Sequence, residues 1–185
     1  MNNLFKNVAI LAAMIISLNL NAQKACNVNV GGETMYPKKN IVENAVNSKA
    51  HTTLVAAVTA AGLVETLQSA GPFTVFAPVN DAFENLPAGT VETLLKPENK
   101  ATLTKVLTYH VVSGTYDFAK LWAMIEKGET KLKTVSGGTL MFASNGPHNI
   151  VVKDESGNSA NITTYDVYQS NGIIQSIDAV LLPKM

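Results

Sequence analysis

The sequence contains no arginine. All fourteen of its basic residues are lysines, and fourteen acidic residues balance them to a formal net charge of zero in a chain of 185 residues. A protein that binds duplex nucleic acid needs a clustered basic face, and the arginine fork is the preferred contact to guanine and phosphate. The composition therefore argues against a nucleic-acid partner, whereas a hydrophobic fraction of 46% is ample for a folded core.

Cysteine is almost absent. Cys26 is the single cysteine of the chain, so an internal disulfide is excluded. Three states of this thiol stay open: acylation after signal cleavage, a free thiol, or pairing between chains. Gln23 and Lys24 stand where a lipidation site has an aliphatic and a small residue, which argues against acylation.

The sequence motifs of common enzymes are also missing. The chain has no Gly-x-Ser-x-Gly elbow, no phosphate-binding glycine loop and no His-Glu-x-x-His pair. Its three histidines, His51, His110 and His148, are far apart and lack the spacing of paired metal ligands. We therefore expect no enzyme activity, no metal and no cofactor. A hydrolase whose catalytic residues are distant in sequence is the alternative.

No segment is long and apolar enough to predict a membrane span. The apolar stretch at residues 8–18 is too short, because a helix needs about 20 residues to cross a bilayer. Lys6 precedes this stretch and the small residue Ala22 follows it, which is the pattern of a signal peptide at residues 1–22. We expect a mature chain that is secreted, periplasmic or held at the cell surface. A buried N-terminal helix is the alternative.

The remaining chain contains one module without internal repeats. Residues 23–39 are polar and contain glycine without any periodicity, so we expect them to form a leader. A single domain is expected at residues 40–184.

Helical patterns precede strand patterns within the domain. Apolar residues recur at helical spacing in the first half, which is interrupted by a short apolar strand at 73–77. Later strand patterns lie at 132–135, 139–143, 150–153, 160–164 and 173–182. The polar residues 154–159 are expected to form a solvated hairpin turn. Helices followed by strands, without alternation, predict an α+β fold.

Three segments resemble one known domain family. Residues 71–87 are GPFTVFAPVNDAFENLP, residues 107–114 are LTYHVVSG, and residues 171–183 are NGIIQSIDAVLLP. This trio, in this order and at these separations, resembles the fasciclin domain, and the resemblance extends over about residues 40–183. It implies helices packed on a two-sheet β-sandwich or wedge. It also implies a secreted, monomeric adhesion module that contacts a protein or polysaccharide on a cell surface or matrix.

The first of these segments predicts a buried strand that turns abruptly into a helix. Phe76 lies in the strand, and Pro78 ends the pairing because proline has no amide donor. The family usually has threonine where this chain has Val79, so Asn80 is expected to take over as cap of the following helix. Phe83 is expected to fold back onto the strand.

The last segment predicts a turn followed by a central buried strand. Asn171 and Gly172 tolerate positive φ and are expected to make the turn. The strand beyond them carries Ile177 and Asp178 and is apolar on both faces. Histidine is common in the family where this chain has Gln175.

Two pairs of residues are candidates for contact with a partner. In animal members of the family, a tyrosine-histidine segment and an aspartate-isoleucine pair are linked to integrin recognition. The resemblance assigns these roles to Tyr109-His110 and to Asp166-Val167, with valine in place of isoleucine. The residues themselves allow a structural interpretation, because His110 continues an apolar helical face and Asp166 suits a turn.

A carrier of an apolar small molecule is a further alternative. Some algal fasciclin-like proteins bind carotenoids, and the resemblance extends this hypothesis to the present chain. The residues that could line such a groove are Trp122 and the six methionines, of which one is the initiator and one lies in the signal peptide, although packing in a core is their commoner use.

Overall fold

The structure is a computed structural model and describes residues 27–184. The predicted signal peptide, residues 1–22, and Cys26 lie outside the described residues. Within the described part, no helix is long and apolar enough to cross a membrane.

Seven strands form one curved sheet. In chain order they are β3 (Phe73–Pro78), β4 (Val111–Ser113), β5 (Lys131–Lys133), β6 (Thr139–Ser144), β7 (Ile150–Lys153), β8 (Ser159–Gln169) and β9 (Gly172–Ile177). Their order in the sheet is β4-β3-β9-β8-β7-β6-β5. Neighbours are antiparallel, except that β3 and β9 run parallel. An isolated bridge between Val112 and Thr134 brings the two edges together, so the sheet curls into a wedge.

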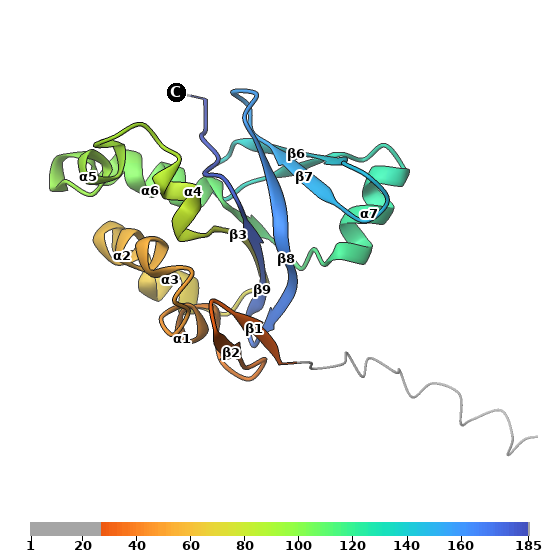
Figure 1. The fold of residues 1–185 in the computed structure, drawn as a ribbon, viewed down its shortest axis with the longest axis horizontal. Coiled ribbons are helices and arrows are strands. Elements are labelled where there is room, and N and C mark those ends of the chain that lie inside the picture. The colour runs from red at the N-terminus through yellow and green to blue at the C-terminus, as the bar shows by residue number, and fades with distance from the viewer. Residues whose placement is uncertain (1–26, 185) are drawn as a thin grey trace, which may run out of the picture.

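Helices cover the outside of this wedge. They are α1 (Ile41–Ala45), α2 (Thr52–Ala61), α3 (Val64–Gln68), α4 (Asn80–Glu84), α5 (Thr90–Leu94), α6 (Lys100–Tyr109) and α7 (Phe118–Glu126), with a 3-10 turn at Pro97–Asn99. Figure 1 shows α1 to α6 on one side of the sheet and α7 on the other. The predicted fold class, α+β with N-terminal helices on a β wedge, is confirmed.

Alternate residues of the central strands face two different hydrophobic clusters, because successive strand side chains point to opposite faces. On β3, Val75 and Ala77 belong to the cluster beneath the helices, whereas Phe76 belongs to the cluster inside the wedge. Ile177 of β9 and Tyr109 of α6 join Phe76 in the second cluster. The three segments that resemble the family motifs therefore share one apolar interior.

A bulge in β8 divides the sheet into its two halves. The first residues of β8 pair with β7, and the strand pairs with β9 from Ile162 onward, with register shifts between Ile162 and Val167. Asp166 has a φ of +57° within this shift, a conformation that aspartate tolerates better than most residues. Its Oδ1 accepts the Phe118 amide at 2.8 Å and Gln175 Nε2 at 2.9 Å. The carboxylate therefore joins the bend to the start of α7.

We had expected an irregular leader before α1, but the structure has regular strands there. This segment contains a hairpin of β1 (Val28–Val30) and β2 (Glu33–Met35), and Val30 and Met35 are buried in the cluster beneath the helices. Strands of three residues are too short to show a period in the sequence. Gly31 joins them at a φ of +62°, and a Cβ there would lie 2.4 Å from the Ala50 amide nitrogen. The turn therefore requires glycine.

The final strand is shorter than its apolar pattern predicted. β9 ends at Ile177, although the sequence predicted a strand to residue 182. The later amides are bonded to side chains instead. Leu181 N donates to His110 Nε2 at 3.0 Å, and Leu182 N donates to Asp154 Oδ2 at 2.9 Å. Hydrophobicity alone does not distinguish a buried strand from a buried irregular segment.

The turn before β9 requires glycine because two strands, β3 and β9, approach each other closely. It does not depend on a positive φ at Asn171 or Gly172. Neither Asn171 nor Gly172 is in the left-handed region. A Cβ on Gly172 would lie 2.1 Å from the Phe73 carbonyl oxygen, so only glycine lets β9 lie this close to β3. At the far end of β9, the Asp178 carboxylate accepts both the Asn161 amide at 2.7 Å and Asn161 Nδ2 at 2.8 Å. These contacts hold both ends of β9.

Asn80 caps a different helix from the one predicted. α4 begins without a side-chain cap, whereas Asn80 Oδ1 accepts the Thr53 amide at 3.2 Å in the first turn of α2. Asn80 Nδ2 donates to the Lys49 carbonyl at 2.8 Å. The other two assignments of this motif agree with the structure. β3 ends at Pro78, and Phe83 is half-buried against the cluster beneath the helices.

Replacing Asn80 by alanine is expected to lower the free energy of unfolding by about 1 to 2 kcal/mol, because α2 loses its cap. Urea unfolding measures the change. Asn85→Ala is the matched control, since Asn85 is exposed and caps α4 only through its backbone amide, which alanine retains, and its effect should stay within about 0.5 kcal/mol. Equal effects of the two substitutions would contradict the capping role.

Candidate functional site

The tyrosine-histidine pair lies in the interior. Tyr109 is 0% exposed, and His110 is also buried. The Tyr109 hydroxyl donates to the Thr139 carbonyl at 2.8 Å and accepts the Glu155 amide at 3.1 Å, and burial raises its pKa. A folded chain therefore cannot present this pair to a partner. The assignment of Tyr109 and His110 to contact with a protein partner is wrong, because Tyr109 packs in the cluster inside the wedge and the His110 ring is buried and bonded to backbone groups.

The aspartate-valine pair is likewise built into the fold. Val167 is buried beneath the helices, so it does not reach a partner. Asp166 is half-buried, and its carboxylate is used by the bend in β8 and the first turn of α7. Contact with a protein partner through Val167 is excluded by its burial.

His110 and Asp154 together hold the end of the chain. The His110 Nδ1–H donates to the Val106 carbonyl at 2.8 Å, which leaves Nε2 as the acceptor for Leu181 N. Burial lowers the pKa of His110 from 6.5 to about 4, so the ring is neutral at pH 7. Asp154 is 0% exposed, contrary to the solvated turn that its polar neighbours predicted. We call this pair, with Leu181 and Leu182, the C-terminal latch.

An apolar pocket of about 220 Å³ lies between the first three helices and the sheet. Five side chains in adjacent registers form its floor. Cross-strand pairing places them in one row, in the order Val167, Ile174, Val75, Val111 and Val135. Four spacings between neighbouring strands give the row a length of about 19 Å. The floor is therefore long and uniformly β-branched.

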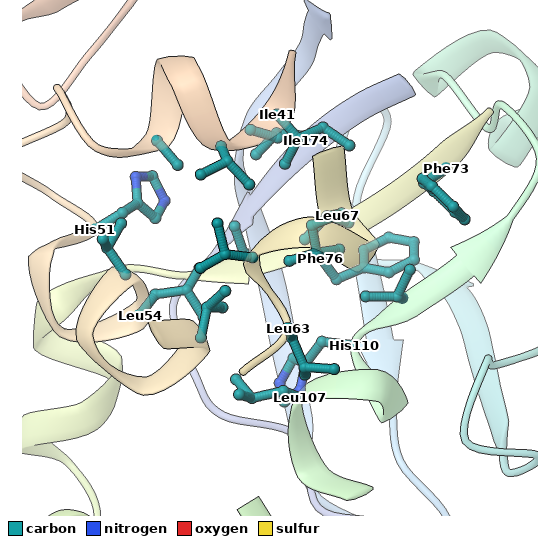
Figure 2. A pocket seen from close by; sticks show the side chains of 18 of the residues that line it. Ile41, His51, Leu54, Leu63, Leu67, Phe73, Phe76, Leu107, His110 and Ile174 are labelled. Carbon is teal, nitrogen blue, oxygen red and sulfur yellow. The ribbon is translucent and has the colours of Figure 1, made fainter. Parts of the chain in front are cut away.

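Helices α1, α2 and α3 form the roof of the pocket. Figure 2 shows Ile41 beside the floor residue Ile174, and Leu63 near Leu107 and His110. Leu54 and Leu67 also line the pocket. Two further residues lie at the rim: Val46 is 54% exposed and Val135 is 47% exposed. They are two of the three large hydrophobic residues that are exposed among residues 27–184. The pocket thus reaches solvent beside apolar side chains.

Two polar residues in the pocket wall, Ser48 and His51, are arranged like part of a catalytic site. Ser48 Oγ lies 2.9 Å from His51 Nδ1, and His51 Nε2 lies 3.4 Å from Ser176 Oγ. A serine nucleophile needs a base whose second nitrogen is oriented by a carboxylate or an equivalent group, whereas here a distant hydroxyl occupies that place. Ser48 also donates to the Val30 carbonyl at 3.3 Å. Both side chains are buried, and burial lowers the pKa of His51.

The described part of the chain contains no cluster of side chains that could bind a metal ion. Within residues 27–184, no three His, Cys, Asp or Glu side chains gather into a group that could hold a metal ion. The residues that line the pocket include no aspartate, glutamate or lysine. The chemistry that this arrangement offers is burial of apolar surface.

Sequence patterns did not reveal this pocket. Its floor comes from five segments, most of which are distant in sequence, and no local motif marks them. Of the residues named for an apolar groove, Met35 lines the pocket, whereas Trp122 stacks on Phe118 in α7 on the other side of the sheet. The one available signal was the largely apolar character of β3 and β9, which predicted burial but not an opening.

The fold and the pocket define an α+β domain with an apolar site between a helical layer and a curved sheet. The chain belongs to the Fasciclin domain family, which matches residues 49–183. The resemblance of the three sequence motifs is thereby confirmed.

Relatives show how far this similarity extends. Protein sll1483 of Synechocystis sp. is 50% identical over 147 residues, which cover 78% of this chain and 74% of that protein. Immunogenic protein MPB70 of Mycobacterium bovis is 34% identical over 145 residues, which cover 75% of this chain and 66% of that protein. A solved FAS1 domain pair from the insect cell adhesion molecule Fasciclin I has the same fold, with a TM-score of 0.69 at 17% identity. That match covers 84% of this chain and 57% of the pair.

Proposed function

We propose that this chain is an exported, non-enzymatic binding module that holds an apolar small molecule in its pocket. The observation that carries this proposal is the apolar lining, from the β-branched floor to the rim residues Val46 and Val135. Transfer of an apolar molecule from water into such a lining is favourable by about 25 cal/mol for each Å² buried. Export rests on the predicted signal peptide.

The size of the pocket sets the class of ligand. Dry apolar cavities of about 150 Å³ take up benzene, and sites for drug-sized molecules have about 300 to 1,000 Å³. A volume of about 220 Å³ lies between these limits. It suits an alkyl chain, a small terpenoid or one end of a longer molecule. A carotenoid, as bound by some algal relatives, would have only part of its length enclosed.

Filling the pocket is expected to abolish this binding. Ala45 lines the roof, and in Ala45→Phe the added ring would occupy the space of the ligand. We expect the affinity for the neutral fluorescent probe N-phenylnaphthylamine to fall by roughly tenfold or more, which is about 1.4 kcal/mol. Fluorescence titration measures it. The control is Ala56→Phe on the exposed side of α2, which should bind the probe as the wild type does. Unchanged affinity in a folded Ala45→Phe variant would place the binding elsewhere.

Adhesion through contact with a protein or polysaccharide is the second candidate function. It is supported by the likeness in fold to domains of an insect cell adhesion molecule. Since Tyr109, His110 and Val167 are interior, adhesion would use exposed residues. Tyr36 at 46% exposure and Val46 are the apolar ones near α1.

The double substitution Tyr36→Ser and Val46→Ser tests adhesion. Beads coated with this variant are expected to bind cells of the source organism several-fold less well than beads coated with the wild type. The melting temperature should stay the same, because both side chains are exposed. Equal binding by the two proteins would remove support for adhesion at this surface.

A further inference from the structure

The N-terminal part of the domain lies outside the region that matches the family. That match begins at residue 49, whereas β1, β2 and α1 span residues 28–45. This segment nevertheless contributes buried side chains to the pocket wall, namely Val30, Met35 and Ile41. The pocket is therefore composed of the family domain and of a segment that the family match does not include.

Hydrogen bonds hold this segment at one end of the pocket floor. Ile41 N donates to Asn171 Oδ1 at 3.0 Å, and Ser170 N donates to the Lys39 carbonyl at 2.9 Å. Both partners lie in the turn between β8 and β9. Figure 1 shows β1 and β2 beside α1 and the start of β9. The hairpin therefore lies at the β8–β9 side of the floor, where Val167 and Ile174 begin the row.

The opposite end of the floor reaches solvent. Val135 ends the row next to β4 and is 47% exposed, whereas Met35 is only 3% exposed. A ligand chain that lies along the floor can extend past Val135 into water. At the hairpin end the same chain meets a buried side chain.

We propose that the β1–β2 hairpin is the end wall of the pocket and that Met35 sets how much of an unbranched apolar chain the pocket encloses. This proposal rests on the proposed function, because it specifies the ligand of the same site. Methionine suits such a position, since its unbranched thioether adjusts to fill irregular space. Asn44 fixes the backbone of Tyr36, the next residue, from both sides: it accepts the Tyr36 amide at 3.0 Å and donates to its carbonyl at 2.8 Å. The wall therefore has a defined position.

Straight-chain alcohols of increasing length test the wall. Each buried methylene is worth about 0.8 kcal/mol, so affinity should rise about fourfold per carbon until the enclosed part of the pocket is full. Beyond that length the gain per carbon should vanish, because added carbons lie in water. Met35→Ala removes three heavy atoms from the wall, and we expect the break in this series to move to chains longer by about two to three carbons. Displacement of N-phenylnaphthylamine gives the affinities.

Met141→Ala is the matched control, because Met141 lies in β6 and does not line the pocket. Its length series should break where the wild-type series does. A second measurement uses the wild-type protein with carbon-13 in its methionine methyl groups. Saturating 1-decanol should shift the Met35 methyl signal and leave the Met141 signal in place, so the test does not depend on folding of a variant.

The outcomes separate the two proposals. A longer break point in Met35→Ala, or a decanol-dependent shift of the Met35 methyl signal, supports the end wall. If alcohols displace the probe but the break point of a folded Met35→Ala variant and the Met35 signal both stay unchanged, the end wall is overturned and the apolar pocket stands. If neither the probe nor any alcohol binds the wild type, the proposed function itself fails.

Discussion

Replacing Asp154 by alanine is expected to lower the free energy of unfolding by about 3 to 5 kcal/mol. The carboxylate is fully buried and accepts the amides of Ser156 at 2.9 Å, Asn158 at 2.8 Å and Leu182 at 2.9 Å, as well as Asn158 Nδ2 at 2.9 Å. Hydrogen bonds to a charged group contribute about 1.5 to 3 kcal/mol each, and their donors would be left without a partner. Urea unfolding at pH 7 measures the loss.

The adjacent residue provides the control for Asp154. Glu155 is exposed, and in Glu155→Gln an amide oxygen can still accept the Thr139 amide, so we expect a change within about 0.5 kcal/mol. Hydrogen exchange at the Leu182 amide should also accelerate in Asp154→Ala, because its acceptor is gone. A variant that loses less than about 1 kcal/mol, with Leu182 still protected, would show that the C-terminal latch contributes little.

Acidification from pH 6.5 to about 4 is expected to destabilise the protein through His110 by about 3 kcal/mol. Burial holds the pKa of His110 near 4 in the folded chain, whereas an unfolded chain has its ordinary value of 6.5. Above pH 6.5 neither state binds the proton, so the stability is fully present. Below that pH the unfolded chain takes up a proton that the folded chain excludes, and stability falls until about pH 4.

The physical cause of this pH dependence is that both ring nitrogens of His110 are already hydrogen-bonded in the folded chain. Its Nε2 accepts Leu181 N, so a proton there would place two donors against each other in a buried site. The pKa of His51 is also lowered by burial and adds to the loss in the same direction. Unfolding free energies at several pH values should therefore give a shallower slope for His110→Gln than for the wild type. Exposed His148→Gln is the control and should follow the wild type.

Parallel slopes for His110→Gln and the wild type would contradict this account. They would mean that His110 is protonated to the same extent in the folded and unfolded chains. The comparison uses the difference between two proteins, so the acid sensitivity of carboxylates that both contain cancels.

The helices, the strands and the family were predictable because their signals are local. The N-cap of α7 is such a local signal, because the Asp117 side chain accepts the Lys120 amide, three residues later, at 2.8 Å. The apolar runs around Phe76 and Ile177 marked central strands, which the structure pairs in parallel. Each of these signals occupies a few consecutive residues, and the side chains of those residues determine their own backbone conformation.

The errors arose where a side chain acts on a distant segment. Asparagine is a common helix cap, but the Asn80 side chain accepts the amide of Thr53 in α2, which lies 27 residues earlier in the chain. Asp154 lies in a polar turn, yet its carboxylate is buried by a segment 28 residues later. Tyr109 and His110 had the polar atoms of a contact surface and proved to satisfy interior backbone groups. Composition predicts the capacity to hydrogen-bond and not the partner.

The sequence by itself determined the α+β class, the family and the order of the elements, since period, turn residues and motif spacing are properties of neighbouring residues. Only the tertiary structure decided where the pocket lies, because its floor joins Val167, Ile174, Val75, Val111 and Val135 through strand register and a backbone hydrogen bond, and most of these residues are far apart in the chain. It also decided that the β1–β2 hairpin closes one end of that floor. Register depends on the packing of all the strands at once, and no single segment encodes it.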